Sequence, residues 1–216
     1  MGRLSRRPLG RDEAFALLHP TEGRADNSCT RRVGLYGVES VTTAFQAQAV
    51  RVGAAVRAIP AADAPARAAE LLRQQGCRTV AVAAVLPDRT AFLDALTTAG
   101  LSAVPLTTLS PTRRADAGIS VATLGVAETG SVLLHSTAED RRVELCVDVH
   151  LVLLDTTALV PTLDTAFRAL RAISARPPAY ATLVSGPSRS ADIERQITIG
   201  VHGPRALHVF LREPGP

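Results

Sequence analysis

Two stretches of the sequence combine glycines, hydroxyls and charges in a way that suits ligand binding. The first, SGPSR, follows an apolar segment that resembles a strand. In an open parallel sheet, ligands bind at the carboxyl ends of strands, where this turn would lie. Its glycine permits close approach of the backbone, and its arginine can grip a carboxylate or phosphate through two hydrogen bonds. The candidate binding residues are Ser185, Gly186, Pro187, Ser188 and Arg189.

A rigid turn before a capped helix explains the same residues without a ligand. Ser190 can cap a helix over residues 191–201, and Asp192 and Glu194 then complement the positive end of its dipole. These carboxylates disfavour a phosphate, so a small carboxylate or a neutral polar ligand and simple capping both stay open. A nucleophile elbow at Ser188 is disfavoured, because that turn requires glycine where Ser190 stands.

The second stretch is AETG, residues 127–130. Glu128 is the one Asp, Glu, Lys or Arg residue between Ile119 and Thr137. A charge in such apolar surroundings either lies at an exposed turn or is buried for a purpose. Placed near the first loop, Glu128 would serve as a base, a nucleophile or a ligand for an amine or hydroxyl.

Other polar residues give weaker signals. His202 and His208 flank a second Gly-Pro turn, but a metal site would need a third ligand that the sequence does not identify. His135 and His150 lie within apolar segments and are expected to be hydrogen-bonded core or rim residues. Asp155, at the end of one such segment, is expected to face the same crevice as the SGPSR loop.

Composition narrows the class of protein. The 216 residues are 46% hydrophobic and 20% charged, which is typical of a globular domain. The first 34 residues hold seven arginines and four acidic residues and thus carry most of the net charge of +4, so nucleic-acid binding is not expected. No apolar run is long enough to span a membrane and no secretory signal is evident, which favours the cytoplasm. The three cysteines cannot alone supply four thiolates, so any redox metal is expected on another chain.

The elements that position these residues alternate between helix and strand. Residues 1–35 are expected to be a loosely ordered basic segment with a short helix at Asp12–Leu18, and residues 36–216 a single domain. Helices are expected at 39–52, 63–75 and 89–100, the last capped by Asp88, and strands at 54–60, 78–87 and 103–106. Such alternation predicts an α/β fold with a mostly parallel sheet and helices on both faces.

The second half contains more strands. Strands are expected at 119–123, 131–135 and 149–155, with 141–147 as a hairpin partner. An amphipathic helix over 161–173 precedes a buried strand at 179–186, and residues 206–213 close the sheet.

The strings GVAETGSVLL, VHLVLL, SGPSRSADIE and GVHGPRALHVFL resemble the family of lactate utilization protein C, the LUD-domain proteins. The resemblance covers about residues 115–212. It implies a fold similar to the sugar-isomerase and CoA-transferase group (NagB/RpiA/CoA transferase-like). It also implies a role in oxidising L-lactate to pyruvate with iron–sulfur partner proteins, with no cofactor on this chain.

Carried over by motif, the candidate site residues are Glu128, Thr129 and Gly130, then residues 185–189 with Asp192, and His202, Gly203 and Pro204. Two departures bear on the transfer: Cys146, Val147 and Asp148 stand where the relatives have Leu-Pro-Pro, and the N-terminus is short and atypical.

Two function hypotheses follow. In the first, the chain is a subunit of a lactate-oxidising assembly. In the second, it is a stand-alone enzyme or binding protein for a small carboxylate, an acyl-CoA or a sugar phosphate, with Glu128 at its centre. Fold analogy alone supports the second.

Overall fold

The computed structural model describes residues 38–173, 180–190, 198–200 and 203–214. Three of the expectations above fall outside these ranges: the basic segment 1–35, the short helix Asp12–Leu18, and the positions of Asp192 and His202.

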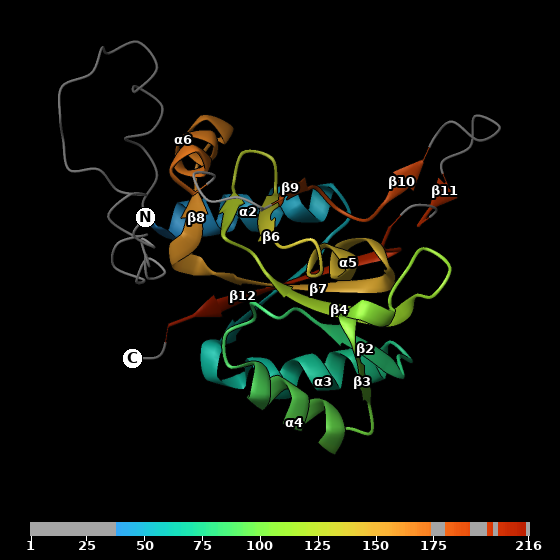
Figure 1. The fold of residues 1–216 in the computed structure, drawn as a ribbon. Helices are drawn as coiled ribbons and strands as arrows, with labels where there is room; N and C mark the ends of the chain where they lie inside the picture. Colours follow the sequence, from blue (N-terminus) through green and yellow to red (C-terminus); the bar gives the residue numbers. More distant parts are fainter. Residues whose placement is uncertain (1–37, 174–179, 191–197, 201–202, 215–216) are drawn as a thin grey trace, which may run out of the picture.

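A six-stranded parallel sheet forms the centre of the molecule (Figure 1). Its strand order is β1-β12-β7-β4-β2-β3. Its strands are β1 (Ala55–Pro60), β2 (Thr79–Val82), β3 (Ser102–Val104), β4 (Ala115–Val121), β7 (Val147–Asp155) and β12 (Ala206–Glu213). The expected α/β class with a mostly parallel sheet is confirmed.

The strand sequences explain their positions in this sheet. β7 lies near the centre, and residues 150–154 are all buried, as a strand covered on both faces requires. β12 is the last strand in the chain, yet it inserts between β1 and β7 instead of closing the sheet at an edge. Its residues Leu207, Val209, Phe210 and Leu211 are buried accordingly.

One face of the parallel sheet is covered by two helices, α3 (Ala64–Gln74) and α4 (Arg89–Thr98). α3 has proline in its first turn and ends before Gly76, whose φ of +76° continues the chain beyond the helix. Asp88 precedes α4 as expected, but it has a left-handed φ of +53° and its side chain makes no capping hydrogen bond.

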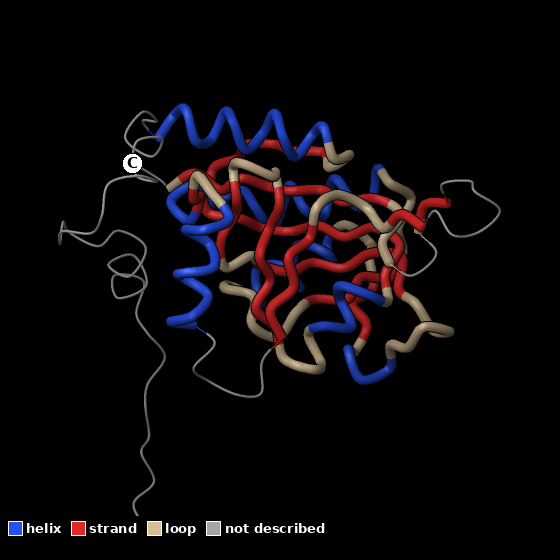
Figure 2. The backbone as a smooth tube through the Cα atoms, turned by 90° about the horizontal axis from the view of Figure 1, so that it is seen from above, coloured by secondary structure: helices blue, strands red, loops and turns tan. Residues whose placement is uncertain are grey.

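The other face carries a more elaborate layer, seen from above in Figure 2. It contains the helices α2 (Val38–Arg51) and α5 (Arg141–Leu145) and a second sheet in the order β8-β5-β6-β9. The strands of the second sheet are β5 (Leu124–Val126), β6 (Ser131–Ser136), β8 (Leu159–Val160) and β9 (Tyr180–Val184). α6 (Leu163–Ile173) packs on the outside of this sheet. Phe45 of α2 and Leu134 of β6 share one core cluster with Val152 and Leu154 of β7.

Three short 3-10 turns join these elements, at Ala61–Asp63, Leu106–Thr108 and Thr156–Ala158. A short antiparallel pair, β10 (Arg189–Ser190) and β11 (Thr198–Ile199), projects from one end of the molecule.

Two expectations about secondary structure are wrong. Residues 141–145 form α5 instead of a hairpin strand. The alternation of Val143, Leu145 and Val147 is typical of a strand, but the buried apolar residues are Val143, Cys146 and Val147, whose spacing of three and four is helical. β9 is not a buried parallel strand but the outer strand of the second sheet, antiparallel to β6, with Tyr180 and Leu183 exposed.

The expected helix over 191–201 is only partly covered by the described residues. Ser190 and Thr198 pair across the β10–β11 ladder, so positions 198 and 199 are extended and are not part of a helix. Residues 191–197 lie outside the described residues.

Candidate functional site

The SGPSR loop is fixed against the C-terminal turn of α2. Gly186 has a φ of +77°, and a Cβ placed on it would lie 2.1 Å from the carbonyl oxygen of Val52. Only glycine tolerates both the left-handed conformation and this approach. Pro187 lies beside Gly53 in the same contact. The glycine thus brings the loop against the protein itself, and a ligand is not needed to explain it.

Arg189 also contacts this turn. Its Nη2 donates a hydrogen bond of 3.0 Å to the carbonyl oxygen of Val52, and the same atom lies 2.5 Å from where a Cβ on Gly53 would be. A cation at a helix C-terminus satisfies free carbonyl groups and is favoured by the helix dipole. The exposed Arg189 side chain therefore has a structural partner already.

The AETG turn contacts the same part of α2 from the other side. Gly130 has a φ of +64°, and a Cβ on it would lie 2.2 Å from the backbone nitrogen of Ala49. Ser131 Oγ donates to Thr129 Oγ1 at 2.7 Å and lies 2.6 Å from Ser185 Oγ. Ser131 thus links Thr129 of the AETG stretch to Ser185 of the SGPSR loop.

Glu128 points elsewhere. It is exposed, and its Oε2 accepts a 3.0 Å hydrogen bond from the backbone nitrogen of Leu163, the first residue of α6. This contact satisfies a free N–H group at a helix N-terminus, where negative charge is favoured. Glu128 is therefore an exposed turn residue, which is one of the two alternatives that the sequence left open.

The loop before β12 completes the arrangement around Gly203. Ser188 N donates to Pro204 O at 2.8 Å, and Arg205 N donates to Asp148 O at 2.7 Å. Arg114 Nη2 donates to Gly203 O at 3.1 Å, while its Nε pairs with Asp148 Oδ1 at 3.0 Å. Asp148 also pairs with Arg205.

These contacts place the SGPSR loop at the amino ends of β7 and β12. The expected position at the carboxyl ends of the parallel strands is therefore wrong, because β9 belongs to the second sheet. Asp155 lies at the opposite end of β7 and pairs with the buried Arg212 at 2.7 Å, so it does not face the same crevice.

A cavity of about 260 Å³ lies beneath the loop. Five candidates from the sequence line it: Ser185, Gly186, Ser188, Gly203 and Pro204. Glu144 from α5, His150 from β7 and several apolar side chains, including Leu145 and Leu207, complete the wall. Segments far apart in the chain thus form one small cavity, whose wall combines apolar side chains with a few polar groups. This combination is usual for a small-molecule site.

His150 is a buried residue of the wall of this cavity. It is 1% exposed, and its Nε2 lies 2.8 Å from Ser120 Oγ. Burial lowers the pKa of His150 from 6.5 to about 4, so the imidazole is neutral at neutral pH. The expectation of a hydrogen-bonded core histidine is confirmed, and the structure adds that it borders the cavity.

Glu144 was not among the candidates from the sequence. It is 5% exposed, and its Oε2 is buried without a hydrogen-bond partner among the described residues. Burial raises the pKa of Glu144, while the hydroxyls of Ser136 and Thr182 and the charge of Arg141 oppose this shift. The sequence signal for Glu144 was its place among buried residues with helical spacing, Val143 and Val147 among them. The prediction of a strand for this segment concealed that signal.

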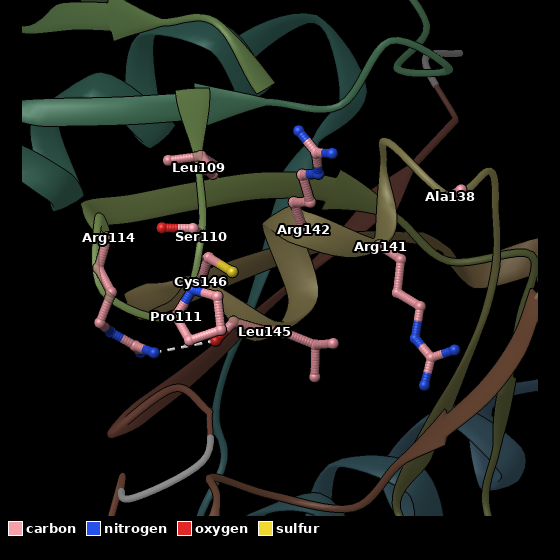
Figure 3. A pocket seen from close by; sticks show the side chains of 9 residues that line it. All are labelled: Leu109, Ser110, Pro111, Arg114, Ala138, Arg141, Arg142, Leu145 and Cys146. Carbon is pink, nitrogen blue, oxygen red and sulfur yellow. Dashed lines mark hydrogen bonds between the residues drawn. The ribbon is translucent and has the colours of Figure 1, made fainter. Parts of the chain in front are cut away.

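A second cavity, of about 500 Å³, lies beside the first and shares Leu145 with it (Figure 3). Three arginines line it, but Figure 3 shows Arg141 and Arg142 pointing in different directions. Arg142 donates to Leu106 O at 3.1 Å, Arg141 lies 4.5 Å from the ring centre of Tyr180, and Arg114 donates to Leu145 O at 3.0 Å. Arg114 and Arg142 are thus engaged by backbone carbonyls, whereas Arg141 stacks on Tyr180 and its buried Nε has no hydrogen-bond partner among the described residues, so the three cations do not converge on one anion.

Two further properties concern the described part of the chain. It contains no group of three or more His, Cys, Asp or Glu side chains arranged to hold a metal ion.

None of the helices within the described ranges is both long and apolar enough to cross a membrane.

Comparison with known proteins gives one family. The profile of the LUD domain matches residues 43–211. An uncharacterized protein of Neisseria meningitidis is 38% identical over 96 residues, covering 44% of this chain and 41% of that protein. Lactate utilization protein C of Halalkalibacterium halodurans is 36% identical over 105 residues, covering 46% of each chain, and that of Bacillus subtilis is 31% identical over 105 residues, covering 46% and 44%.

Each aligned region therefore spans less than half the length of these curated relatives. Among solved structures, a DUF162 family protein from Deinococcus radiodurans superposes with a TM-score of 0.62 at 25% identity. The superposition covers 83% of this chain and 99% of that protein, so the two share their fold.

Proposed function

The chain belongs to the LUD domain family, and we propose that it is a subunit of a system that oxidises L-lactate to pyruvate together with iron–sulfur partner proteins. The relatives named lactate utilization protein C support the lactate part of this proposal. The observation that links this proposal to a site in the structure is that one small cavity is lined by Ser185, Gly186, Ser188 and Gly203.

The cavity suits a small, partly apolar ligand. Hydroxyl groups of Ser185 and Ser188 can bind the polar atoms of a hydroxy acid, and Leu145 and Leu207 can pack against its methyl group. Oxidation of lactate removes two electrons and two protons. The three widely separated cysteines of this chain argue that the electrons pass to clusters held by partner proteins.

The test is a pull-down of the full chain with candidate cysteine-rich partner proteins, followed by L-lactate-dependent dye reduction. We expect dye reduction only when this chain is present, and no reduction with D-lactate as substrate. Failure to co-purify, together with full dye reduction by the partners alone, would overturn the proposal.

A pair of serine variants links this activity to the cavity. Ser188→Ala removes a hydroxyl from the wall and is expected to lower the rate by about 3- to 10-fold, the cost of one hydrogen bond. Ser102→Ala, at an exposed position of β3, is the control and should leave the rate unchanged. Equal rates for both variants would separate the activity from this cavity.

A second function is favoured by one observation, the buried Glu144 and His150 within a cavity of this chain. We propose as the alternative that the isolated chain turns over or binds a small carboxylate, an acyl-CoA or a sugar phosphate without partners. Thermal-shift measurements on the purified chain with each class test it. A shift with one class supports it, and no shift with any of them contradicts it.

A further inference from the structure

The cavity beneath the SGPSR loop has no cationic side chain among its described lining residues that could neutralise a bound anion. No arginine is among its described lining residues, and its ionisable groups are Glu144 and His150. The nearest arginines of the loop region are engaged elsewhere: Arg114 with Asp148 and backbone carbonyls, and Arg189 with Val52 O. A carboxylate in this cavity therefore needs another source of compensation.

His150 does not supply it. The imidazole is almost completely buried, and its Nε2 is joined to Ser120 Oγ. Burial lowers the pKa of His150 to about 4, so the ring carries no charge at neutral pH.

Glu144 is the remaining ionisable group of the wall, and its carboxyl has unused hydrogen-bonding capacity. Its Oε2 is buried and has no partner in the described part of the chain. The groups that act on its carboxyl come from its neighbouring elements: Arg141 and Asp140 from its own segment, Ser136 from β6 and Thr182 from β9. His150 lines the same cavity. Asp140 is itself buried, and Arg141 lies over the ring of Tyr180.

Two carboxylates cannot share such surroundings in ionised form. Each buried charge costs several kcal/mol unless it is paired, and like charges in one site raise each other's pKa. Burial already raises the pKa of Glu144. One proton shared between the Glu144 carboxyl and a bound acid removes the repulsion between the two charges. It also gives the unpartnered oxygen of Glu144 a hydrogen bond, as in other sites where a neutral carboxylic acid serves as a donor.

We propose that Glu144 binds a small carboxylate as a neutral carboxylic acid that donates a hydrogen bond to the ligand, so that the cavity takes up the anion and one proton together. The choice of ligand, L-lactate or pyruvate, rests on the proposed function. When Glu144 is ionised in the free protein, the proton comes from solvent on binding and returns to solvent on release.

The proposal fixes the sign of the pH dependence. At pH values below the pKa of Glu144 in the free protein, the donor is already formed and affinity does not change with pH. Above that pKa, affinity falls by up to about tenfold for each pH unit, because each binding event must first take up a proton. Binding is therefore tighter at mildly acidic than at mildly alkaline pH.

Isothermal titration of the full chain with L-lactate and with pyruvate, across this pH range and in two buffers of different ionisation enthalpy, measures both the affinity and the number of protons taken up. We expect proton uptake approaching one per ligand at the alkaline end. Glu144→Gln keeps a donor of the same shape and should bind with no proton uptake and little change with pH. Glu139→Gln, an exposed neighbour, is the matched control and should behave as the wild type.

Several results would overturn the proposal: no binding at any pH, binding without proton uptake, or a Glu144→Gln variant that keeps the pH dependence. Tighter binding at higher pH would also overturn it, since ionised Glu144 would then be accepting from a ligand hydroxyl. Dye reduction with the partner proteins is measured separately, so the subunit role can survive while this inference fails.

A second variant keeps the proposal testable if Glu144→Gln does not fold. Ser136→Ala removes a hydroxyl that favours the ionised form of Glu144, so it should raise the pKa of Glu144 further and move the onset of the affinity loss to higher pH. An onset at the wild-type pH would contradict the assignment of the proton to Glu144.

Discussion

The two faces of the parallel sheet are built differently. Between the sheet and the helices α3 and α4 lies an apolar core that includes Leu151, Leu153 and Phe210. The opposite face buries polar side chains beside its apolar ones, because alternate residues of β4 and β7 point there, Ser120 and His150 among them. The others on this side are Ser131, Ser136, Asp140 and Glu144.

The glycines differ between the two faces as well. Gly76 and Gly100, which end α3 and follow α4, have open space where a Cβ would be. On the other face, Gly118 lets Val143 of α5 approach β4, and Gly130 and Gly186 contact the backbone of α2. One face is thus held by volume and patterning, and the other by close backbone contacts around a polar cavity.

The largest expected effect comes from the backbone contact at Gly130. Gly130→Ala should cost more than about 4 kcal/mol or prevent folding, because the new Cβ meets the backbone of α2 in a left-handed conformation. Gly100→Ala, at nearly the same φ but with open space, should cost only about 1 kcal/mol. Chemical denaturation of both variants checks this, and equal losses would contradict the role of the contact.

The second prediction concerns the pH dependence of stability. Since the pKa of His150 in the folded protein is depressed to about 4, its stabilising contribution is present above 6.5 and is lost as pH falls from about 6.5 to about 4. The full loss is on the order of 3 kcal/mol. Subtracting the free energy of unfolding of His150→Gln from that of the wild type should leave this slope.

Leu153→Ala on the opposite face is the control. It should cost about 3 kcal/mol by leaving a cavity in the apolar core, with the same pH slope as the wild type. If His150→Gln kept the wild-type slope instead, His150 would not be the buried neutral base that the structure indicates.

The smallest expected effect is that of Arg189→Ala. Its hydrogen bond to Val52 O is exposed, so we expect a loss of about 1 kcal/mol or less in the free energy of unfolding. Arg168→Ala removes an exposed ion pair on α6 and should cost about 0.5 kcal/mol or less. A loss of several kcal/mol for Arg189→Ala would contradict this expectation and would show that the loop contact stabilises the fold as strongly as a core contact does.

Much of the α3 and α4 side could be predicted from sequence alone. The helical spacing of Ala68, Leu71 and Leu72 and the stop at Gly76 gave α3 within a residue at each end. These signals are local, and the tertiary structure does not oppose them. The family strings likewise indicate the LUD domain, and the match of its profile to residues 43–211 confirms it.

The candidate site was predicted only in part. The SGPSR loop and Gly203 do line the cavity, whereas Glu128 caps α6 and Asp155 pairs with Arg212 at the far end of β7. Glu144 was missed because the alternation of Val143, Leu145 and Val147 indicates a strand, whereas residues 141–145 form a helix.

By itself, the sequence determined the α/β class, the central strand expected at 149–155 and the motif loop, since periodicity, burial demand and turn residues act within a few positions. Only the tertiary structure decided that β9 leaves the parallel sheet, that the loop meets the amino ends of β7 and β12, and that Glu144 and His150 border one cavity. These are contacts between segments far apart in the chain, and local spacing carries no information about which distant segment a strand pairs with.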